Sequence, residues 1–362
     1  MDVSSRLSRL SSGDGAEYVL VLRVEDIRWL TGFTGGTSQL LVCRSTHDAW
    51  LFVDGRYFER AHDETTASRA SVHIERVVPE ISTAEMIARI VGVSSVAIDP
   101  THVTVHFMTT VQSHCTVVQE RIQLDELRRV KDDAEISLIA SAAGIADNAL
   151  RAVVADGLVG RTERQIRNQL DHLMREGGAD DVAFDTIVAT GPLGARPHHE
   201  PSDALVESGH GVVIDFGAMV QGYKSDMTRT IRVGAVSAEY QRMFDLVLEA
   251  ESAGIASVKA GVSGALVDAA ARAVFIREGV DHEYVHGTGH GIGLYIHEQP
   301  ILSPRCTAVL GVNEVVTVEP GLYRGGVGGV RIEDLVVVTG NSCRILTQTP
   351  KDLTCPRSPR TI

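Results

Sequence analysis

Acidic side chains occupy positions in this sequence where apolar ones are expected. Asp215 lies inside the apolar run Val212–Phe216, and Asp226 follows eleven residues later, with Gly217 and Gly222 between them. A carboxylate buried among apolar side chains is costly unless it is hydrogen-bonded, paired or bound to a metal. The segment predicts a hairpin whose even-length loop places the two acids opposite each other. Opposed side chains lie roughly 4.5–5.5 Å apart at Cβ, where two carboxylates repel unless one is protonated or a cation lies between them.

A second segment repeats this pattern. Glu319 ends the apolar run that begins at Val315, and Glu333 lies within the run Val330–Leu335. A single acid in a strand is more often solvated or at an edge, and Arg331 offers Glu333 a counter-charge without any metal. Four such acids in two similar hairpins favour a metal site over that alternative. The glycines that predict the second hairpin are Gly321, Gly325, Gly326, Gly328 and Gly329.

Histidines add potential nitrogen ligands. His286, His290 and His297 lie within twelve residues of one another, among glycines that let backbone approach a ligand closely. A lone histidine is usually a core or surface residue, but three so close together favour a site. The neighbouring pair His198 and His199 lies in a proline-flanked loop, where a surface pair is as reasonable an interpretation as a functional one.

Other catalytic motifs are absent from the sequence. The residue four positions after His297 is Ile301, so the HExxH pattern of zinc proteases is incomplete. The glycines that begin at Gly287 miss the dinucleotide-binding pattern, because its last glycine position holds Ile292. Neither a phosphate-binding GxxxxGK[ST] loop nor a GxSxG nucleophile elbow occurs.

Composition narrows the class of protein. The chain has 362 residues, of which 44% are hydrophobic, and a formal net charge of −13 that disfavours nucleic acid as a partner. Five cysteines without a CxxC pair indicate reduced thiols rather than a disulfide framework. We expect neither a signal peptide nor a membrane span, because we find no apolar stretch of about 18 residues. A cytoplasmic location follows as an expectation.

The length suggests two domains. In the first third, short apolar runs predict strands, and Ser82 with Glu85 forms a capping-box spacing before a helix. We therefore predict a small α/β domain over residues 1–124. The predicted strands are Tyr18–Arg23, Gln39–Cys43, Trp50–Val53 and Ser94–Ile98.

A catalytic domain is predicted over residues 125–350. An apolar stripe from Ile136 to Val153 predicts a long helix, and a second helix is expected to begin at Thr162 and end at Gly177. Further helices are expected at 238–258 and 264–278. The polar, proline-containing end, residues 351–362, predicts a loose tail.

The acids and histidines fall within short motifs that occur in a fixed order. These are IDFG (214–217), SDMTRT (225–230), HGTGHGIGL (286–294), IHE (296–298), VEPG (318–321) and RIED (331–334). Together they resemble the creatinase/aminopeptidase "pita-bread" metallopeptidase family, in its branch of Xaa-Pro dipeptidases (prolidases) and Xaa-Pro aminopeptidases. WLTGF (29–33) and FVDGRY (52–57) resemble the N-terminal domain of that branch. The resemblance implies an α/β (α+β) fold, in which a creatinase-like domain precedes a curved antiparallel sheet covered by helices.

The resemblance also implies a ligand set for two ions. Asp215 would chelate one ion, Asp226 and Glu333 would bridge both, and His290 and Glu319 would bind the other. All five positions hold the residue that the family pattern requires. The set is oxygen-rich, which favours Mn²⁺ and tolerates Co²⁺, Zn²⁺ or Fe²⁺.

Catalytic and substrate-binding roles come from the same resemblance. Glu319 would act as the proton acceptor for a metal-bridging water, and His198 and His297 would contact the substrate. Arg331 would order the site. The residues expected to line the substrate pocket are Phe184, Tyr223 and Arg331.

The implied function is a dinuclear metal-dependent exopeptidase that cleaves Xaa-Pro bonds at the N-terminus of dipeptides or short peptides. A dipeptidase is favoured over an Xaa-Pro aminopeptidase because the N-terminal domain is short. Methionine aminopeptidase is a weaker alternative, and a non-catalytic peptide-binding module of the same fold is a fourth. A homodimer is expected from the resemblance.

Overall fold

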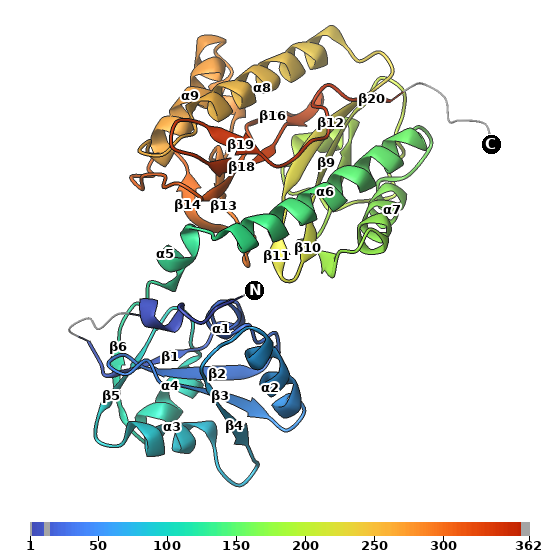
Figure 1. Ribbon diagram of the computed structural model, residues 1–362. Helices are drawn as coiled ribbons and strands as arrows, with labels where there is room; N and C mark the ends of the chain where they lie inside the picture. Colours follow the sequence, from blue (N-terminus) through green and yellow to red (C-terminus); the bar gives the residue numbers. More distant parts are fainter. Residues whose placement is uncertain (1, 11–14, 356–362) are drawn as a thin grey trace. The chain divides into compact units, whose positions relative to one another are not determined.

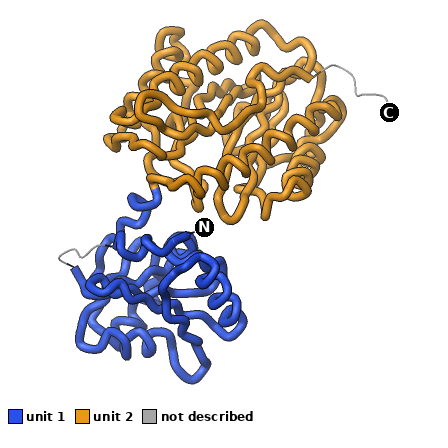
Figure 2. Tube along the Cα trace, in the orientation of Figure 1, with its two compact units in different colours: residues 1–128 blue, residues 129–362 orange. Residues whose placement is uncertain are grey.

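The computed structural model describes residues 2–10 and 15–355, which form two compact units divided between Arg128 and Arg129 (Figure 2). The division expected between residues 124 and 125 lies at the start of helix α5 (Leu124–Arg129), the last element before this boundary. A small α/β unit is followed by a larger unit of mostly antiparallel sheets and covering helices, in agreement with the predicted fold class.

The first unit is built on a six-stranded mixed sheet with the order β4-β3-β2-β1-β5-β6 (Figure 1). Four of these strands are the ones predicted from apolar runs, and helix α3 begins with the predicted capping box of Ser82 and Glu85. The elements are β1 (Tyr18–Val21), α1 (Val24–Thr31), β2 (Ser38–Cys43), β3 (Ala49–Asp54), α2 (Phe58–Ala67), β4 (His73–Val77), α3 (Thr83–Val91), β5 (Ser95–Ile98), α4 (Val105–Gln112) and β6 (Thr116–Gln119).

Four long helices cover the sheets of the second unit (Figure 1). One apolar core joins α6 and α7 to strands β9 and β12, and another joins α8 and α9 to strands β16 and β17. Each helix begins at an N-cap whose side chain accepts a backbone N–H, which satisfies one of the free donors of the first turn. The helices are α6 (Asp133–Ala155), α7 (Glu163–Glu176), α8 (Ala238–Ser257) and α9 (Gly264–Arg277).

Helix α6 is long and apolar enough to cross a membrane by length and composition, with a mean hydropathy of 1.4. The helix is not an unbroken apolar stretch, because it contains Glu135, Asp147 and Arg151. Asp147 is buried, and its carboxylate accepts backbone N–H bonds from Gln348 and Thr349. A core-facing stripe with an internally paired acid is typical of an interior helix of a globular domain.

The strands of the second unit form a four-stranded sheet (β20-β12-β9-β8), a five-stranded sheet (β14-β13-β15-β18-β19) and two smaller sheets. These two larger sheets position the four acids: Asp215 lies on β9, and Asp226, Glu319 and Glu333 lie directly next to the ends of β12, β15 and β18. The strands are β7 (Asp181–Val182), β8 (Ile187–Thr190), β9 (Gly211–Phe216), β10 (Ala218–Val220), β11 (Tyr223–Lys224), β12 (Met227–Val233), β13 (Gly289–Gly291), β14 (Glu298–Leu302), β15 (Val315–Val318), β16 (Gly321–Arg324), β17 (Gly328–Arg331), β18 (Asp334–Val338), β19 (Cys343–Ile345) and β20 (Thr354–Cys355).

The segment that follows residue 350 is not a loose tail as far as Cys355. Strand β20 pairs in parallel with β12, and Cys355 is buried. Lys351 forms ion pairs with the buried acids Glu251 and Asp334. The polar composition of this segment gave no sign of these partners, because they lie about 100 residues and 17 residues away in the sequence. Residues 356–362 lie outside the described part of the chain.

Candidate metal centre

The first pair of acids lies on one hairpin but not directly opposite each other. In the antiparallel pairing of β9 with β12, Asp215 is opposite Thr228, and Phe216 is opposite Met227. Asp226 lies just beyond β12, one position further toward the turn. The predicted direct opposition was therefore wrong, whereas the shared face holds, because Asp226 and Thr228 are two residues apart on one strand path.

The second pair of acids has the predicted arrangement. Strands β15 and β18 pair with Val318 opposite Asp334, and the same register resumes in β16 and β17 with Gly321 opposite Arg331. Glu319 and Glu333 therefore lie across from each other in the short interruption between these two ladders. The glycine-rich segment forms the predicted hairpin.

His290 is inserted between two strands at a point where only glycine fits beside it. A Cβ on Gly289 would lie 2.0 Å from the Thr317 carbonyl oxygen, and one on Gly291 would lie 2.2 Å from the Gln299 carbonyl oxygen. The alternation of histidine and glycine in this motif thus lets β13 approach β15 and β14 closely. The result is that the imidazole of His290 faces the acids.

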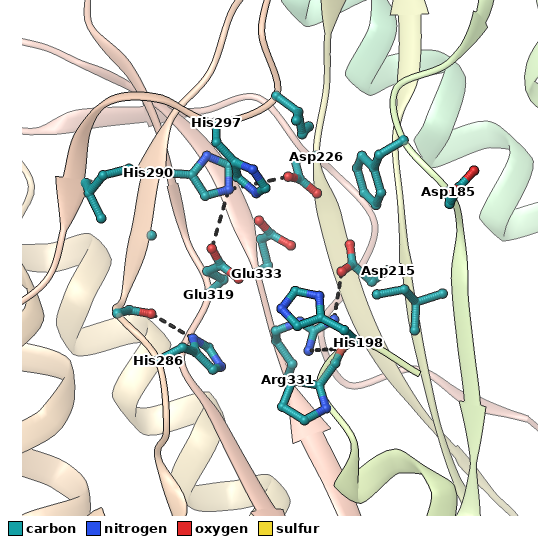
Figure 3. A pocket seen from close by; sticks show the side chains of 17 residues that line it. Asp185, His198, Asp215, Asp226, His286, His290, His297, Glu319, Arg331 and Glu333 are labelled. Carbon is teal, nitrogen blue, oxygen red and sulfur yellow. Dashed lines mark hydrogen bonds and ion pairs between the residues drawn. The ribbon is translucent and has the colours of Figure 1, made fainter. Parts of the chain in front are cut away.

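The acids and His290 converge on one point (Figure 3). Ligand atoms of Asp215, Asp226 and Glu333 all lie within 4.8 Å of one another. The His290 Nε2 atom lies 3.7 Å from Asp226 Oδ2 and 3.5 Å from Glu319 Oε1. These five side chains are the predicted ligand set, brought together from β9, β13 and the ends of the two hairpins.

The electrostatics of this cluster favour the binding of a cation. Burial, reinforced by neighbouring carboxylates, raises the pKa of Asp226 and Glu333 well above the ordinary values. Burial raises the pKa of Glu319 to about 8, and burial lowers the pKa of His290 to about 4. Because the two kinds of group shift in opposite directions, the cluster without a cation favours protonated acids and a neutral imidazole.

Some of the candidate ligand atoms in this cluster accept no hydrogen bond. The Nδ1 of neutral His290 donates to the Gly291 carbonyl 2.9 Å away, so its Nε2 lone pair points at acidic oxygens. Asp215 Oδ1 and Glu333 Oε1 are both buried with no hydrogen-bond partner. A buried polar atom without a partner is costly, and several converging acceptors fit divalent cations. The residues present therefore fit the metal ions that the sequence predicts.

Arg331 orders one acid of the cluster rather than neutralising the other. Its guanidinium donates to Asp215 Oδ2 at 2.7 Å, to Thr228 Oγ1 at 3.1 Å and to the Tyr323 hydroxyl at 2.8 Å. Glu333, which the sequence offered as its partner, instead accepts a hydrogen bond from Thr228 at 2.7 Å. Arg331 is buried and held in one orientation.

The cluster forms the floor of a cavity of about 480 Å³. His198 and His297 line it on different sides of the acids, as Figure 3 shows, and both are exposed to solvent. The ring of His297 meets that of His290 edge-on, with centroids 4.5 Å apart. Phe184 also lines the cavity, together with isoleucines of the rim.

Tyr223, by contrast, is not among the residues that line the cavity. It is buried, and its hydroxyl donates to Glu135 at 2.7 Å, in the first turn of α6. The predicted role of Tyr223 in the substrate pocket is therefore wrong. Its position in β11, the tip of the first hairpin, directs the side chain to the helix instead.

Three side chains at the site were given no individual role by the sequence. Thr228 bonds both Glu333 and Arg331, and its spacing of two from Asp226 on a strand was an available signal. His286, whose pKa burial lowers to about 4, lies within hydrogen-bonding distance of the Tyr323 hydroxyl, 2.8 Å away. No sequence pattern links His286 with Tyr323, because their contact depends on how a loop packs against strand β16.

Comparison with known proteins agrees with the geometry. The model of metallopeptidase family M24 matches residues 137–340, and that of the creatinase/prolidase N-terminal domain matches residues 5–130. An uncharacterised peptidase of Bacillus subtilis is 35% identical over 351 residues, which cover 96% of this chain and 98% of the relative.

Solved structures are similar over nearly the whole chain. An Xaa-Pro dipeptidase from Bacillus anthracis superposes with a TM-score of 0.91 and 33% identity, covering 97% of this chain and 98% of the other. An X-Pro aminopeptidase from Thermotoga maritima gives a TM-score of 0.87 and 34% identity, covering 96% and 99%. The chain therefore belongs to metallopeptidase family M24, with a creatinase/prolidase N-terminal domain before its catalytic domain.

Proposed function

We propose that this protein is an exopeptidase that uses two divalent metal ions to hydrolyse the Xaa-Pro bond at the N-terminus of dipeptides or short peptides. The observation that carries the proposal is the buried group of four carboxylates and one imidazole with unpaired acceptor atoms at the floor of an open cavity. The names of the similar structures, Xaa-Pro dipeptidase and X-Pro aminopeptidase, supply the bond that is cleaved.

Asp215, Asp226, His290, Glu319 and Glu333 would hold the ions. When bound, divalent ions act as Lewis acids that lower the pKa of a water and polarise the scissile carbonyl. Four carboxylates with one imidazole make an oxygen-rich set, so we propose Mn²⁺ as the preferred ion, with Co²⁺, Zn²⁺ or Fe²⁺ tolerated. The cavity lies open above this set, which gives the substrate access to it.

The side chains around the set divide the remaining work. Glu319 takes a proton from the attacking water and passes it to the leaving nitrogen. His297, beside His290, donates to the developing oxyanion, and His198 holds the residue on the leaving side of the bond. Arg331 keeps the Asp215 carboxylate in a fixed orientation. The apolar walls around Phe184 accept the proline ring, which carries no N–H to satisfy.

The dipeptidase and the aminopeptidase differ only in the length of peptide accepted. The test offers Ala-Pro, Ala-Pro-Ala and Met-Ala-Ser to metal-stripped protein reloaded with Mn²⁺. Cleavage of Ala-Pro alone supports the dipeptidase that we favour, and cleavage of Ala-Pro-Ala supports the aminopeptidase. Cleavage of Met-Ala-Ser alone, or of no peptide with any of the four ions, would overturn the Xaa-Pro proposal.

We further propose that the protein acts as a homodimer in the cytoplasm. The five cysteines are all free, which suits a reducing compartment. Sedimentation velocity at micromolar concentration tests the dimer, and a single species of 39.0 kDa, the mass of one chain, would exclude it.

A further inference from the structure

One buried acid outside the metal cluster is bonded to the loop that carries His198. Glu163 is the first residue of α7 and is fully buried. Its Oε1 atom accepts the backbone N–H of Thr190 at 2.8 Å. Its Oε2 atom accepts the backbone N–H of Ser202 at 2.8 Å and the Ser202 hydroxyl at 2.6 Å. His199 places its Nε2 atom 2.8 Å from the same Oε2 atom.

These contacts fix both ends of one segment. Thr190 is the last residue of β8, and Ser202 lies within the connection from β8 to β9, which begins with a short 3-10 helix, Gly191–Ala195. The backbone reinforces the far end, where Arg164 N–H donates to the Ser202 carbonyl and Glu163 N–H donates to the Ala204 carbonyl, both at 3.1 Å. The loop between the fixed ends, residues 191–201, is thereby held against the start of α7.

The fixed loop carries His198, a predicted catalytic residue that lies on neither hairpin. Pro197 and His198 line the cavity, while the next residue, His199, points the other way and is buried against Glu163. The Pro197 carbonyl also accepts a long hydrogen bond from Arg331, at 3.4 Å. His198 ends a turn and His199 directly follows it, so holding His199 against Glu163 restricts the backbone that directs His198 into the cavity.

A carboxylate is the side chain suited to this place. Four donors converge on Glu163, and an ionised carboxylate is an acceptor only, whereas a glutamine amide would set its own N–H groups against at least one donor. The position in the first turn of a helix also favours negative charge. The charge that burial would otherwise penalise is therefore compensated.

We propose that Glu163 is a positioning residue that holds His198 in the cavity by fixing both ends of the loop between Thr190 and Ser202. The proposal rests on the proposed function, in which His198 contacts the substrate. Glu163 itself does not line the cavity and touches no residue of the metal cluster.

The test compares Mn²⁺-loaded wild type with Glu163→Gln, a change that keeps the shape but replaces one acceptor oxygen with an NH2 donor. We expect kcat/KM on the Xaa-Pro substrate to fall about 10- to 100-fold, the range seen when a supporting hydrogen bond is lost or a catalytic group is displaced. Mn²⁺ affinity, measured by titration calorimetry, should stay within about twofold, since the metal cluster is untouched. Unchanged kcat/KM would overturn the proposal.

A double-mutant cycle separates positioning from general destabilisation. If Glu163 acts through His198, then Glu163→Gln should not reduce kcat/KM further in a His198→Ala background. Multiplying effects would show that Glu163 acts elsewhere and would overturn the proposal. The matched control is Gln165→Ala, which removes the capping-box acceptor of Thr162 in the same helical turn and should leave kcat/KM within about twofold. An equal loss in the control would also overturn it.

A second pair of variants serves if Glu163→Gln does not fold. His199→Leu removes the ring donor and should reduce kcat/KM as Glu163→Gln does, whereas His199→Gln keeps a donor and should restore most of it. Equal effects of the two would contradict the proposal.

Hydrogen exchange examines the loop without any substrate, so it stays informative if no peptide is cleaved. We expect amides of residues 190–202 to exchange at least tenfold faster in Glu163→Gln than in wild type, with those of β13 and β15 unchanged. Equal exchange of this loop in the two proteins would refute the proposal that Glu163 fixes it. Failure of wild type to cleave any Xaa-Pro peptide would refute only the proposed function.

Discussion

The two hairpins that supply the four carboxylates reach the same cavity with different registers. On the first hairpin, Asp226 is displaced along the strand from the position opposite Asp215, where Thr228 lies instead. On the second, Glu319 and Glu333 lie across from each other, between two ladders of one register. Similar sequence patterns thus produce a diagonal pair and a direct pair.

The difference is tied to how the hairpins orient each other. Arg331, from the second hairpin, bonds Asp215 of the first, and Thr228, from the first, bonds Glu333 of the second. Because Thr228 takes the place opposite Asp215, its hydroxyl is free to reach across. Each hairpin therefore positions one acid of the other, and each of these acids keeps a second buried oxygen without a partner.

The largest expected effect on hydrolysis comes from removing Asp226, the acid that lies diagonally from Asp215 on the first hairpin. Asp226→Ala should reduce hydrolysis by more than about 1,000-fold, because a bridging ligand of the proposed centre is lost. The chelated protein should fold as wild type does, since loss of a buried acid whose pKa is raised relieves repulsion. Peptide assays with Mn²⁺ and melting curves in EDTA measure the two effects. Asp245→Ala, at an exposed position of α8, is the control, and full activity of Asp226→Ala would sink the two-ion model.

The second largest effect should come from removing the metal, which should lower the free energy of unfolding because the two hairpins lose their shared ligand. With free Mn²⁺ at 100 times its dissociation constant, each independent site should add about 2.7 kcal/mol to the free energy of unfolding. Urea unfolding with Mn²⁺ and with EDTA gives the difference. Asp226→Ala should lose most of this gain, and equal unfolding curves for wild type in the two conditions would count against a metal site.

The pH dependence of the chelated protein sharpens the role of the direct pair. The pKa of Glu319 is raised to about 8 in the fold, so its contribution to stability is full at low pH and is lost as pH rises through 8. The pKa of His290 is lowered to about 4, which costs stability only below its ordinary value of 6.5. Between pH 6.5 and 8 only acids with a raised pKa, such as Glu319, change the stability of the cluster. The melting temperature in EDTA should therefore fall as pH rises through this window.

The control for this dependence is Glu319→Gln, which should flatten the slope between pH 6.5 and 8. Mn²⁺ should oppose the slope in wild type, because ionised carboxylates bind the metal better. A melting temperature that rises over this window in EDTA would contradict the assignment.

The smallest expected effect tests the exchange between the hairpins. Thr228→Val keeps the shape but removes the hydroxyl, so it should lower the free energy of unfolding by about 1–3 kcal/mol and weaken Mn²⁺ binding about tenfold or more. Thr230→Val is the matched control, because Thr230 on the same strand bonds only backbone atoms of Arg331. Equal Mn²⁺ affinities of the two variants would contradict the role of Thr228 in positioning Glu333 of the other hairpin.

Local patterns were reliable where one segment contains the whole signal. The caps of α3 and α7, the apolar strands of the first unit and the glycine-rich hairpin were all predicted, since each depends on residues close in sequence. The acids of the cluster stood out because a charge in an apolar run is costly anywhere. Tyr223 was misplaced because its partner, Glu135, is 88 residues away.

The sequence by itself determined the kinds of atoms at the site: four carboxylates in apolar strands, a histidine flanked by glycines, and a motif order specific to one family. Tertiary structure alone decided the hairpin registers, the partner of Arg331 and the ion pair of Lys351 with Glu251. Chemistry is carried by residue type, which the sequence states directly. Pairing across the fold depends on packing between distant segments, whose contacts leave no periodic trace in the chain.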